Sequence, residues 1–357
     1  MKLIKGKSLT NFGIILSFGF IFFCFLISIF SYFIIPDSSR FSNQMHLEIN
    51  SKYPGFSTQF IIIPNENSNK QNFISRMFVG NMYPNDEILI SSYNFNDNGI
   101  EYRDLYDSEK KSIEYSKFPK GSDKKTIETK YIKTRKYIFG TDNYGRDVFS
   151  RIVLGTRVSI SIGIIAVLIS LLIGVTIGLI SGFYGGLIDK FFMMIINIFW
   201  SIPTLLLVIA FSLALGKGFW QVYVAVGLTM WVEVARVVRG QVISEKNKDY
   251  ITATKVLGFS DFRIFYNHLL PNIIGPILII SAANFASAIL IESGLSFLGI
   301  GAQPPNASWG SMIKDHYNYI ALGKPYLAIV PGLCIMILVM AFMVLGSALR
   351  DRLDVRS

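Results

Sequence analysis

The most regular feature of the chain is a series of long apolar stretches, separated by shorter segments that hold most of its charged residues. The hydrocarbon core of a bilayer is ~30 Å thick, and a helix of roughly 20 apolar residues crosses it. Intervals with at most two charges reach that length at six places. These predicted spans are residues 13–35, 158–182, 191–215, 220–238, 273–291 and 326–349. The pattern predicts an all-α integral membrane protein with six transmembrane helices.

Two further features refine these spans. Pro203 interrupts the third span and is expected to kink it, because proline removes a helical hydrogen bond. The apolar part of the first span is longer than that of a signal peptide, and no small-x-small cleavage site follows it. We therefore expect residues 1–36 to form the N-terminus and an uncleaved first anchor.

The distribution of lysine and arginine predicts the orientation, because short cytoplasmic loops are enriched in both residues. Basic residues gather before the first span, between the fourth and fifth spans, and after the sixth. They are Lys2, Lys5 and Lys7, then Lys246, Lys248, Lys255 and Arg263, and finally Arg350, Arg352 and Arg356. We expect both termini to be cytoplasmic and residues 36–157 to lie outside.

Residues 37–136 are predicted to form a small mixed α/β insert on the extracytoplasmic side, between spans one and two. Segments 56–63 and 87–95 are rich in β-branched and aromatic residues, and 97–99 is a turn that leads into a strand at 100–106. Residues 110–136 are dominated by lysine, serine and acids and are expected to be solvated. The insert either receives a substrate-delivery protein or only caps the outer face.

Composition excludes several classes of protein. Only 16% of the 357 residues are charged, whereas 51% are hydrophobic, and two cysteines cannot build a disulfide scaffold. The net charge of +10 is spread along the chain and gives no nucleic-acid footprint. The sequence contains no P-loop, no nucleophile elbow and no metal-ligand spacing around its three histidines. We expect no catalytic residue, no metal and no cofactor in this chain.

Polar or small residues inside the spans are candidates for packing or for a translocation path. Glu233 lies three residues before Arg236, and a local ion pair between them is the simplest expectation. Glu292 is either a buried polar anchor or, with Ser293, Ser296 and Phe297, part of a translocation path or outer gate. The glycines at four-residue spacing favour close helix packing, either within the chain or against another subunit. They are Gly174, Gly178 and Gly182.

The connection 241–272 carries the most informative local pattern. Residues 249–257 are helical by pattern, and Gly258 follows as the residue just past a helix end. Ser260 can cap a second short helix that we expect to end at Pro271, where span five begins. A helix–glycine–helix elbow along the membrane surface is suited to docking in a groove on another protein.

The same connection resembles the EAA loop of permease subunits of bacterial ABC importers. The residues that carry this resemblance run from Asp249-Tyr250-Ile-Thr252-Ala253-Thr254 through Gly258 to His268-Leu-Leu-Pro271-Asn272. Blocks 139–159, 292–310 and 346–354 are similar to the dipeptide/oligopeptide permease C-type branch of that family. Thr252 stands where the family has Glu, which puts in doubt a docking role that needs a carboxylate there.

The resemblance implies a type I importer fold with a permease core at 137–357 and a pore-forming role in peptide import. It also implies a second homologous permease subunit, two ABC ATPase subunits that bind ATP and Mg, and an extracytoplasmic binding protein. The implied ATPase-coupling residues are Asp249, Tyr250, Thr252, Ala253, Thr254, Gly258, Asp261, His268 and Pro271. A permease for another solute such as nickel, an ATPase-independent transporter, and a membrane anchor with an active outer domain are the alternatives.

Overall fold

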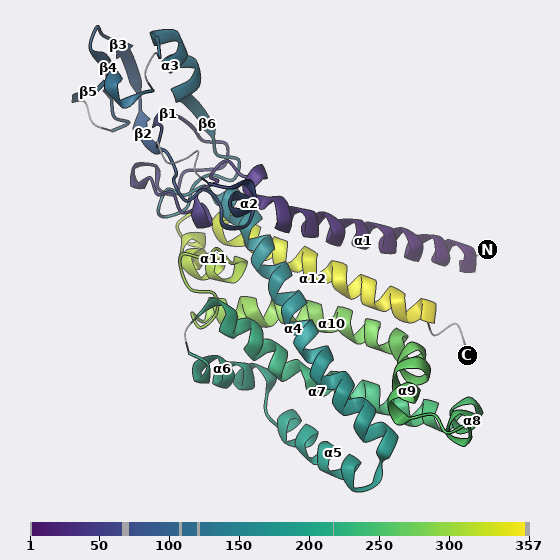
Figure 1. The fold of residues 1–357 in the computed structure, drawn as a ribbon. Helices are drawn as coiled ribbons and strands as arrows, with labels where there is room; N and C mark the ends of the chain where they lie inside the picture. Colours follow the sequence, from purple (N-terminus) through teal and green to yellow (C-terminus); the bar gives the residue numbers. More distant parts are fainter. Residues whose placement is uncertain (1, 66–70, 107–108, 120–121, 217, 354–357) are drawn as a thin grey trace.

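The computed structural model describes residues 2–65, 71–106, 109–119, 122–216 and 218–353, and its architecture is a helical bundle with a small β-containing unit at one end (Figure 1). Long helices make up the bundle. They are α1 Lys2–Ile34, α4 Val148–Tyr184, α5 Gly186–Ser201, α6 Thr204–Ala214, α7 Phe219–Lys246, α10 Leu270–Phe297 and α12 Tyr326–Leu353. Shorter helices are α2 Phe73–Val79, α3 Lys124–Tyr131, α8 Asp249–Val256, α9 Asp261–Ile264 and α11 Trp309–His316.

Five helices of the described chain are long and apolar enough to cross a membrane, and a bent pair adds a sixth if it counts as one span. The bent pair is α5 with α6, which meet at an angle of 95°. Pro203 lies at this break, directly before α6, so the kink predicted for the third span is confirmed. The other spans are helices longer than predicted, and α4 begins ten residues before the predicted start at 158.

The bundle is held together mainly by the contact between α4 and α7. Along this contact Gly174, Gly178 and Gly182 face α7 of the same chain, where a Cβ atom on Gly178 would lie 2.7 Å from the Cβ of Val238. Both helices can approach so closely because these positions lack side chains. Helix α1 packs beside α4 and α12, while α5 and α6 lie at the opposite edge of the bundle (Figure 1).

The unit at the end of the bundle contains two small antiparallel sheets. The strands are β1 Ser57–Ile63, β2 Asp86–Ile90, β3 Ser92–Phe95, β4 Gly99–Arg103, β5 Lys110–Glu114 and β6 Ile132–Lys136. They pair in the orders β2-β1-β6 and β3-β4-β5. The prediction of one strand at 87–95 was wrong, because the chain passes from the first sheet to the second at Ser91, whose N–H bonds to Arg103.

Residues 110–136 are more structured than their composition suggests. They form β5, α3 and β6, and the side chains of Ile127 and Tyr131 are buried in an apolar cluster with Ile61 and Ile100. Asp123 caps α3 by accepting a hydrogen bond from the N–H of Thr126. A few well-placed apolar residues therefore suffice to fold a stretch that is otherwise rich in lysine and acids.

The start of α1 and the end of α12 lie at the end of the bundle opposite the β unit, and α8 and α9 lie at that same end (Figure 1). Short 3₁₀ segments (Arg40–Ser42, Leu47–Ile49, Tyr115–Lys117 and Tyr317–Ile320) and a π-helical turn at Phe265–Leu269 complete the described secondary structure.

Candidate functional site

The elbow, residues 249–269, projects from the bundle between α7 and α10. Helix α8 runs over Asp249–Val256, and Gly258 follows just past its end with a φ of +76° that suits glycine, so both features predicted from the pattern are confirmed. Ser260 occupies the position before α9, as expected, although its side chain makes no capping hydrogen bond. The prediction that the second helix ends at Pro271 was wrong.

Instead, α9 continues through the π-helical turn into α10, so the second half of the elbow and the spanning helix form one continuous helix. Pro271 lies just after the π-helical turn, and this wider turn is where the helix accommodates a residue that lacks an N–H. A displacement of the elbow is therefore passed to α10 without an intervening flexible loop.

The inner side of the elbow is anchored in the apolar core. Ile251, Ile264 and Leu269 are each fully buried, in a cluster that also contains Phe183 of α4 and Val242 of α7. Thr254 is buried beside them, and its hydroxyl donates to the carbonyl of Ile251. The elbow therefore contacts α4, α7 and α10 together.

The outer side of the elbow is apolar and exposed. Val256, Leu257, Phe262 and Tyr266 have exposed fractions of 83%, 71%, 78% and 66%. They flank Gly258 on both sides of the turn. An apolar surface on a protruding corner, with an anchored inner side, is typical of a site that docks another protein.

Polar residues of the elbow hold its geometry. The Tyr184 hydroxyl lies 2.8 Å from the Asp261 carboxylate, and His268 stacks on Phe259. The Tyr250 hydroxyl donates to Glu245 at 2.6 Å, and partial burial together with this carboxylate raises the pKa of Tyr250 to about 12. Asp249, Thr252 and Ala253 are exposed on α8.

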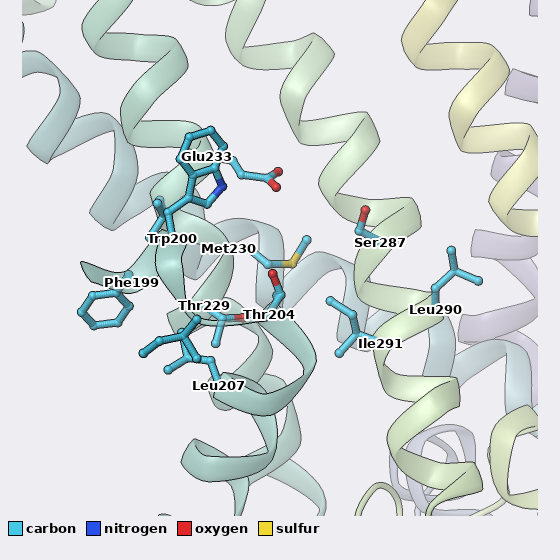
Figure 2. Close-up of a pocket in the computed structure, with 12 residues that line it drawn as sticks. Phe199, Trp200, Thr204, Leu207, Thr229, Met230, Glu233, Ser287, Leu290 and Ile291 are labelled. Atoms are coloured by element: carbon cyan, nitrogen blue, oxygen red, sulfur yellow. The ribbon is translucent and has the colours of Figure 1, made fainter. Parts of the chain in front are cut away.

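A second feature is a cavity of about 280 Å³ between the bent pair, α7 and α10 (Figure 2). Its wall combines aromatic rings, hydroxyl groups, aliphatic side chains and one carboxylate. The residues drawn and labelled in Figure 2 are Phe199, Trp200, Thr204, Leu207, Thr229, Met230, Glu233, Ser287, Leu290 and Ile291. The break before α6 opens this space, because two consecutive helices diverge there.

The ion pair expected between Glu233 and Arg236 is absent among the described residues. The Arg236 guanidinium instead lies over the Trp200 ring, 3.2 Å from its centroid, and donates to the Asn197 side-chain oxygen at 2.8 Å. Glu233 is exposed and lines the cavity. The sequence could not show that Trp200 and Asn197 compete with Glu233 for Arg236, because both residues are far from Arg236 along the chain.

The candidates around Glu292 lie elsewhere. Glu292 is 1% exposed, and its carboxylate accepts a hydrogen bond from the Ser296 hydroxyl at 2.6 Å, with the Ser293 and Ser308 hydroxyls nearby. None of the four candidates lines the cavity of Figure 2. This burial fits the polar-anchor alternative for Glu292, whereas Phe297 is 44% exposed at the end of α10.

A buried polar junction connects the start of α4 with α11. Asp142 accepts the N–H groups of Tyr144 and Arg146 and pairs with the Arg146 side chain at 2.6 Å, and Asp147 caps α4. The Trp309 indole donates to the Ile152 carbonyl across the chain. This junction explains the 139–151 block as a structural clamp, and no group of three metal-ligating side chains occurs anywhere in the described chain.

The cavity residues were missed by sequence reasoning, apart from Glu233. Thr204, Thr229 and Ser287 are single hydroxyls within apolar helices. Such residues commonly bond to their own helix, as Thr229 does to Val226. Only the Pro203 break gave a signal, since a discontinuous span often lines a path through the membrane.

Comparisons with known proteins show which transport proteins this chain is similar to. The chain is 44% identical over 216 residues to the dipeptide transport system permease protein DppC of Bacillus subtilis, a match that covers 60% of this chain and 68% of that protein. It is 41% identical over 221 residues to the oligopeptide transport system permease protein OppC of the same organism, covering 62% and 72%. The glutathione transport system permease protein GsiD of Pectobacterium atrosepticum is 39% identical over 215 residues, covering 60% and 71%.

The family model described as the binding-protein-dependent transport system inner membrane component matches residues 174–356, which is 183 of the 357 residues. The match includes the elbow, the cavity-lining helices and the last span. The chain therefore belongs to the family of binding-protein-dependent transport system inner membrane components.

Proposed function

We propose that this chain is a pore-forming permease subunit of an ATP-driven importer that carries di- and oligopeptides across the bacterial inner membrane. The observation that carries the proposal is the elbow, which is anchored inside on three spanning helices and exposes an apolar outer surface. The names of the relatives, which include dipeptide, oligopeptide and glutathione systems, support the peptide class of cargo.

The proposed topology has six spans in the type I importer arrangement, with the bent pair α5–α6 as one broken span. Both termini and the elbow face the cytoplasm, and the β unit faces outside. The location of the chain ends and of α8 and α9 at one end of the bundle supports this orientation (Figure 1). The proposed parts are an anchor at 1–36, an extracytoplasmic insert at 37–136 and a permease core at 137–357 with its coupling loop at 241–272.

The proposed partners are a second homologous permease subunit, two ABC ATPase subunits and an extracytoplasmic binding protein. ATP and Mg are bound by the ATPases, whose closure moves the elbow. ATP binding shifts the balance between inward and outward states only if the elbow docks differently in the two states. Because α9 runs without a break into α10, movement of the elbow rotates this span as a rigid rod.

In this arrangement, coupling of the spans to the ATPases does not require the glutamate that the family has at this position and that Thr252 replaces. The exposed surface on both sides of Gly258 is apolar, with Val256, Phe262 and Leu257 as its most exposed side chains. Burial of such side chains in a groove contributes roughly 1.5–3 kcal/mol each. We propose that these contacts carry most of the docking, with Asp249, Ala253 and Thr252 at their edge.

A substitution at Gly258 tests the proposal. An ideal Cβ there meets no atom within 4 Å, so Gly258→Val introduces no clash but strains a backbone at φ +76°, by about 1–3 kcal/mol. We expect the reconstituted complex to retain ATP hydrolysis while ATP-dependent uptake of a labelled dipeptide falls at least tenfold. Gly323→Val, at φ +75° in an equally open turn far from the elbow, is the matched control.

Uptake by the Gly258→Val complex at the wild-type rate would contradict the coupling role of the elbow. Absence of ATP-dependent dipeptide uptake by the wild-type complex would contradict the proposed function itself. Nickel uptake by the same wild-type complex would instead support the alternative cargo.

A further inference from the structure

Glu233 is a carboxylate in the middle of a spanning helix that forms no ion pair with any residue in the described ranges. It lies near the midpoint of α7, Phe219–Lys246. Ionisable residues inside a membrane are costly and occur where they face a protein interior or a water-filled path. Glu233 is exposed and lines the cavity of Figure 2, so its carboxylate is open to a partner from outside the chain.

The two arginines on the same helix are committed elsewhere. Arg236 lies over Trp200 and donates to Asn197. Arg239, one turn further, forms a two-point ion pair with Asp189 of α5 at 2.6 and 2.7 Å. Both guanidinium groups hold the bent pair against α7, and neither neutralises Glu233.

The surroundings of Glu233 fit an ammonium group. Figure 2 shows its carboxylate extending past Trp200 into the space toward the helix that carries Ser287. The hydroxyls of Thr204 and Ser287 also line the cavity and offer further acceptors. Leu207, Leu290 and Ile291 form the apolar remainder of the wall, which suits variable side chains.

We propose that Glu233 binds the protonated amino group of the peptide cargo as it crosses the membrane. This inference rests on the proposed import function and names a subsite of its path. Every peptide with a free amino end carries this group whatever its side chains are, so one carboxylate serves a broad set of cargoes. Pairing with the cargo also offsets the cost of the charge within the bilayer.

Replacing the carboxylate by an amide of the same shape tests this role. The complete complex is reconstituted in liposomes with saturating dipeptide-loaded binding protein, and uptake and ATP hydrolysis are measured together. We expect Glu233→Gln to lower dipeptide uptake about tenfold, the effect of losing one charge-assisted hydrogen bond, while ATP hydrolysis stays near the wild-type rate. Glu233→Asp, which keeps the charge, restores part of the uptake.

The matched control is Glu101→Gln on strand β4, where the carboxylate is 37% exposed and pairs with the exposed Lys110, and its uptake should equal that of the wild type. Wild-type uptake by Glu233→Gln would overturn the proposal. Loss of the second permease subunit from the purified Glu233→Gln complex would overturn it too, because the carboxylate would then pair across the subunit interface.

An equal fall of uptake and ATP hydrolysis in Glu233→Gln would also overturn the proposal, since it would assign Glu233 to coupling. If the wild-type complex takes up no dipeptide while it hydrolyses ATP, the proposed peptide function fails first and this subsite fails with it. These four outcomes therefore separate failure of the subsite from failure of the function.

Discussion

At the scale of single residues, His316 shows how the buried polar junction between α4 and α11 depends on protonation. The side chain is 1% exposed, with Nδ1 2.7 Å from the Met312 carbonyl and Nε2 3.2 Å from the Asn143 side-chain oxygen. Burial lowers the pKa of His316 below its ordinary value of 6.5. The Met312 carbonyl, Asp142 and Asp315 act in the opposite direction, and Arg151 acts with burial.

This lowered pKa predicts a loss of stability in acid. Because the folded protein prefers the neutral ring, the stabilisation is complete above the unfolded value near 6.5 and is lost as the pH falls toward the folded pKa. We expect the melting temperature of the purified complex to fall between about pH 7.5 and about pH 5.5. His316→Asn should show a shallower fall, and equal slopes would refute this role of the histidine.

Single residues also mark what sequence reasoning could and could not reach. Gly258 was predicted because a glycine after a helical pattern has a local cause, a positive φ. The free carboxylate of Glu233 was not, because it depends on Trp200 and Asn197, which the fold brings to Arg236 from another helix. A special backbone conformation can be predicted from neighbouring residues in the sequence, whereas the partner that a charged side chain selects depends on the tertiary packing.

At the scale of elements, the contact of α4 with α7 determines how the cavity wall is held. The carbonyls of Trp231, Ala235 and Arg239 and the side chains of the following valines pass directly over the glycine strip. The same helix α7 presents Glu233 and Thr229 to the cavity on another side. Any expansion of the α4–α7 contact therefore moves the cavity residues as well.

A matched pair of alanine substitutions tests this contact. At Gly178 a new Cβ would lie 2.7 Å from the Val238 Cβ and 2.8 Å from the Ala235 carbonyl oxygen, so Gly178→Ala should destabilise the fold by about 1–3 kcal/mol. At Gly240, on α7 itself, a Cβ meets nothing within 4 Å, and Gly240→Ala should be neutral or stabilising by up to about 1 kcal/mol. Melting of the detergent-solubilised complex measures both, and equal melting temperatures would contradict the packing argument.

Intervals with few charges predicted the positions of the spans, because a bilayer tolerates few charges. They did not predict where the helices begin and end. Helix α4 begins at Val148 because Arg151 and Arg157 are accommodated beside the polar junction and the α2 segment, outside the apolar core. The helix from α9 to α10 passes Pro271 because the π-helical turn Phe265–Leu269 just before it accommodates the ring and the missing N–H. Both departures come from side chains and backbone geometry that a hydropathy criterion ignores.

At the scale of the whole molecule, the β unit is attached to the bundle by a small set of contacts. The Lys52 N–H donates to the Thr141 hydroxyl, and the Lys52 carbonyl accepts from the Tyr326 hydroxyl at 2.8 Å. Arg157 of α4 donates to the Met77 carbonyl. The apolar clusters of the spans contain no residue from β1 to β6, so the bundle has a core of its own.

The two ends of the β unit meet where they leave the bundle, because the Tyr137 N–H donates to the Phe56 carbonyl at 2.8 Å. A short Gly-Ser linker can therefore join residues 56 and 137 in place of residues 57–136, a replacement that also removes α2 and its contacts with α1 and α4. Because the spans keep their own core, we expect membrane insertion, co-purification of the ATPases and ATP-dependent dipeptide uptake to persist.

Binding-protein stimulation of ATP hydrolysis, compared with that of the full-length complex, reports whether the unit receives the delivery protein. A loss of stimulation shows that it does, and no change assigns it a capping role. Complete loss of uptake with the ATPases still bound would contradict the location of the transport function in the spans.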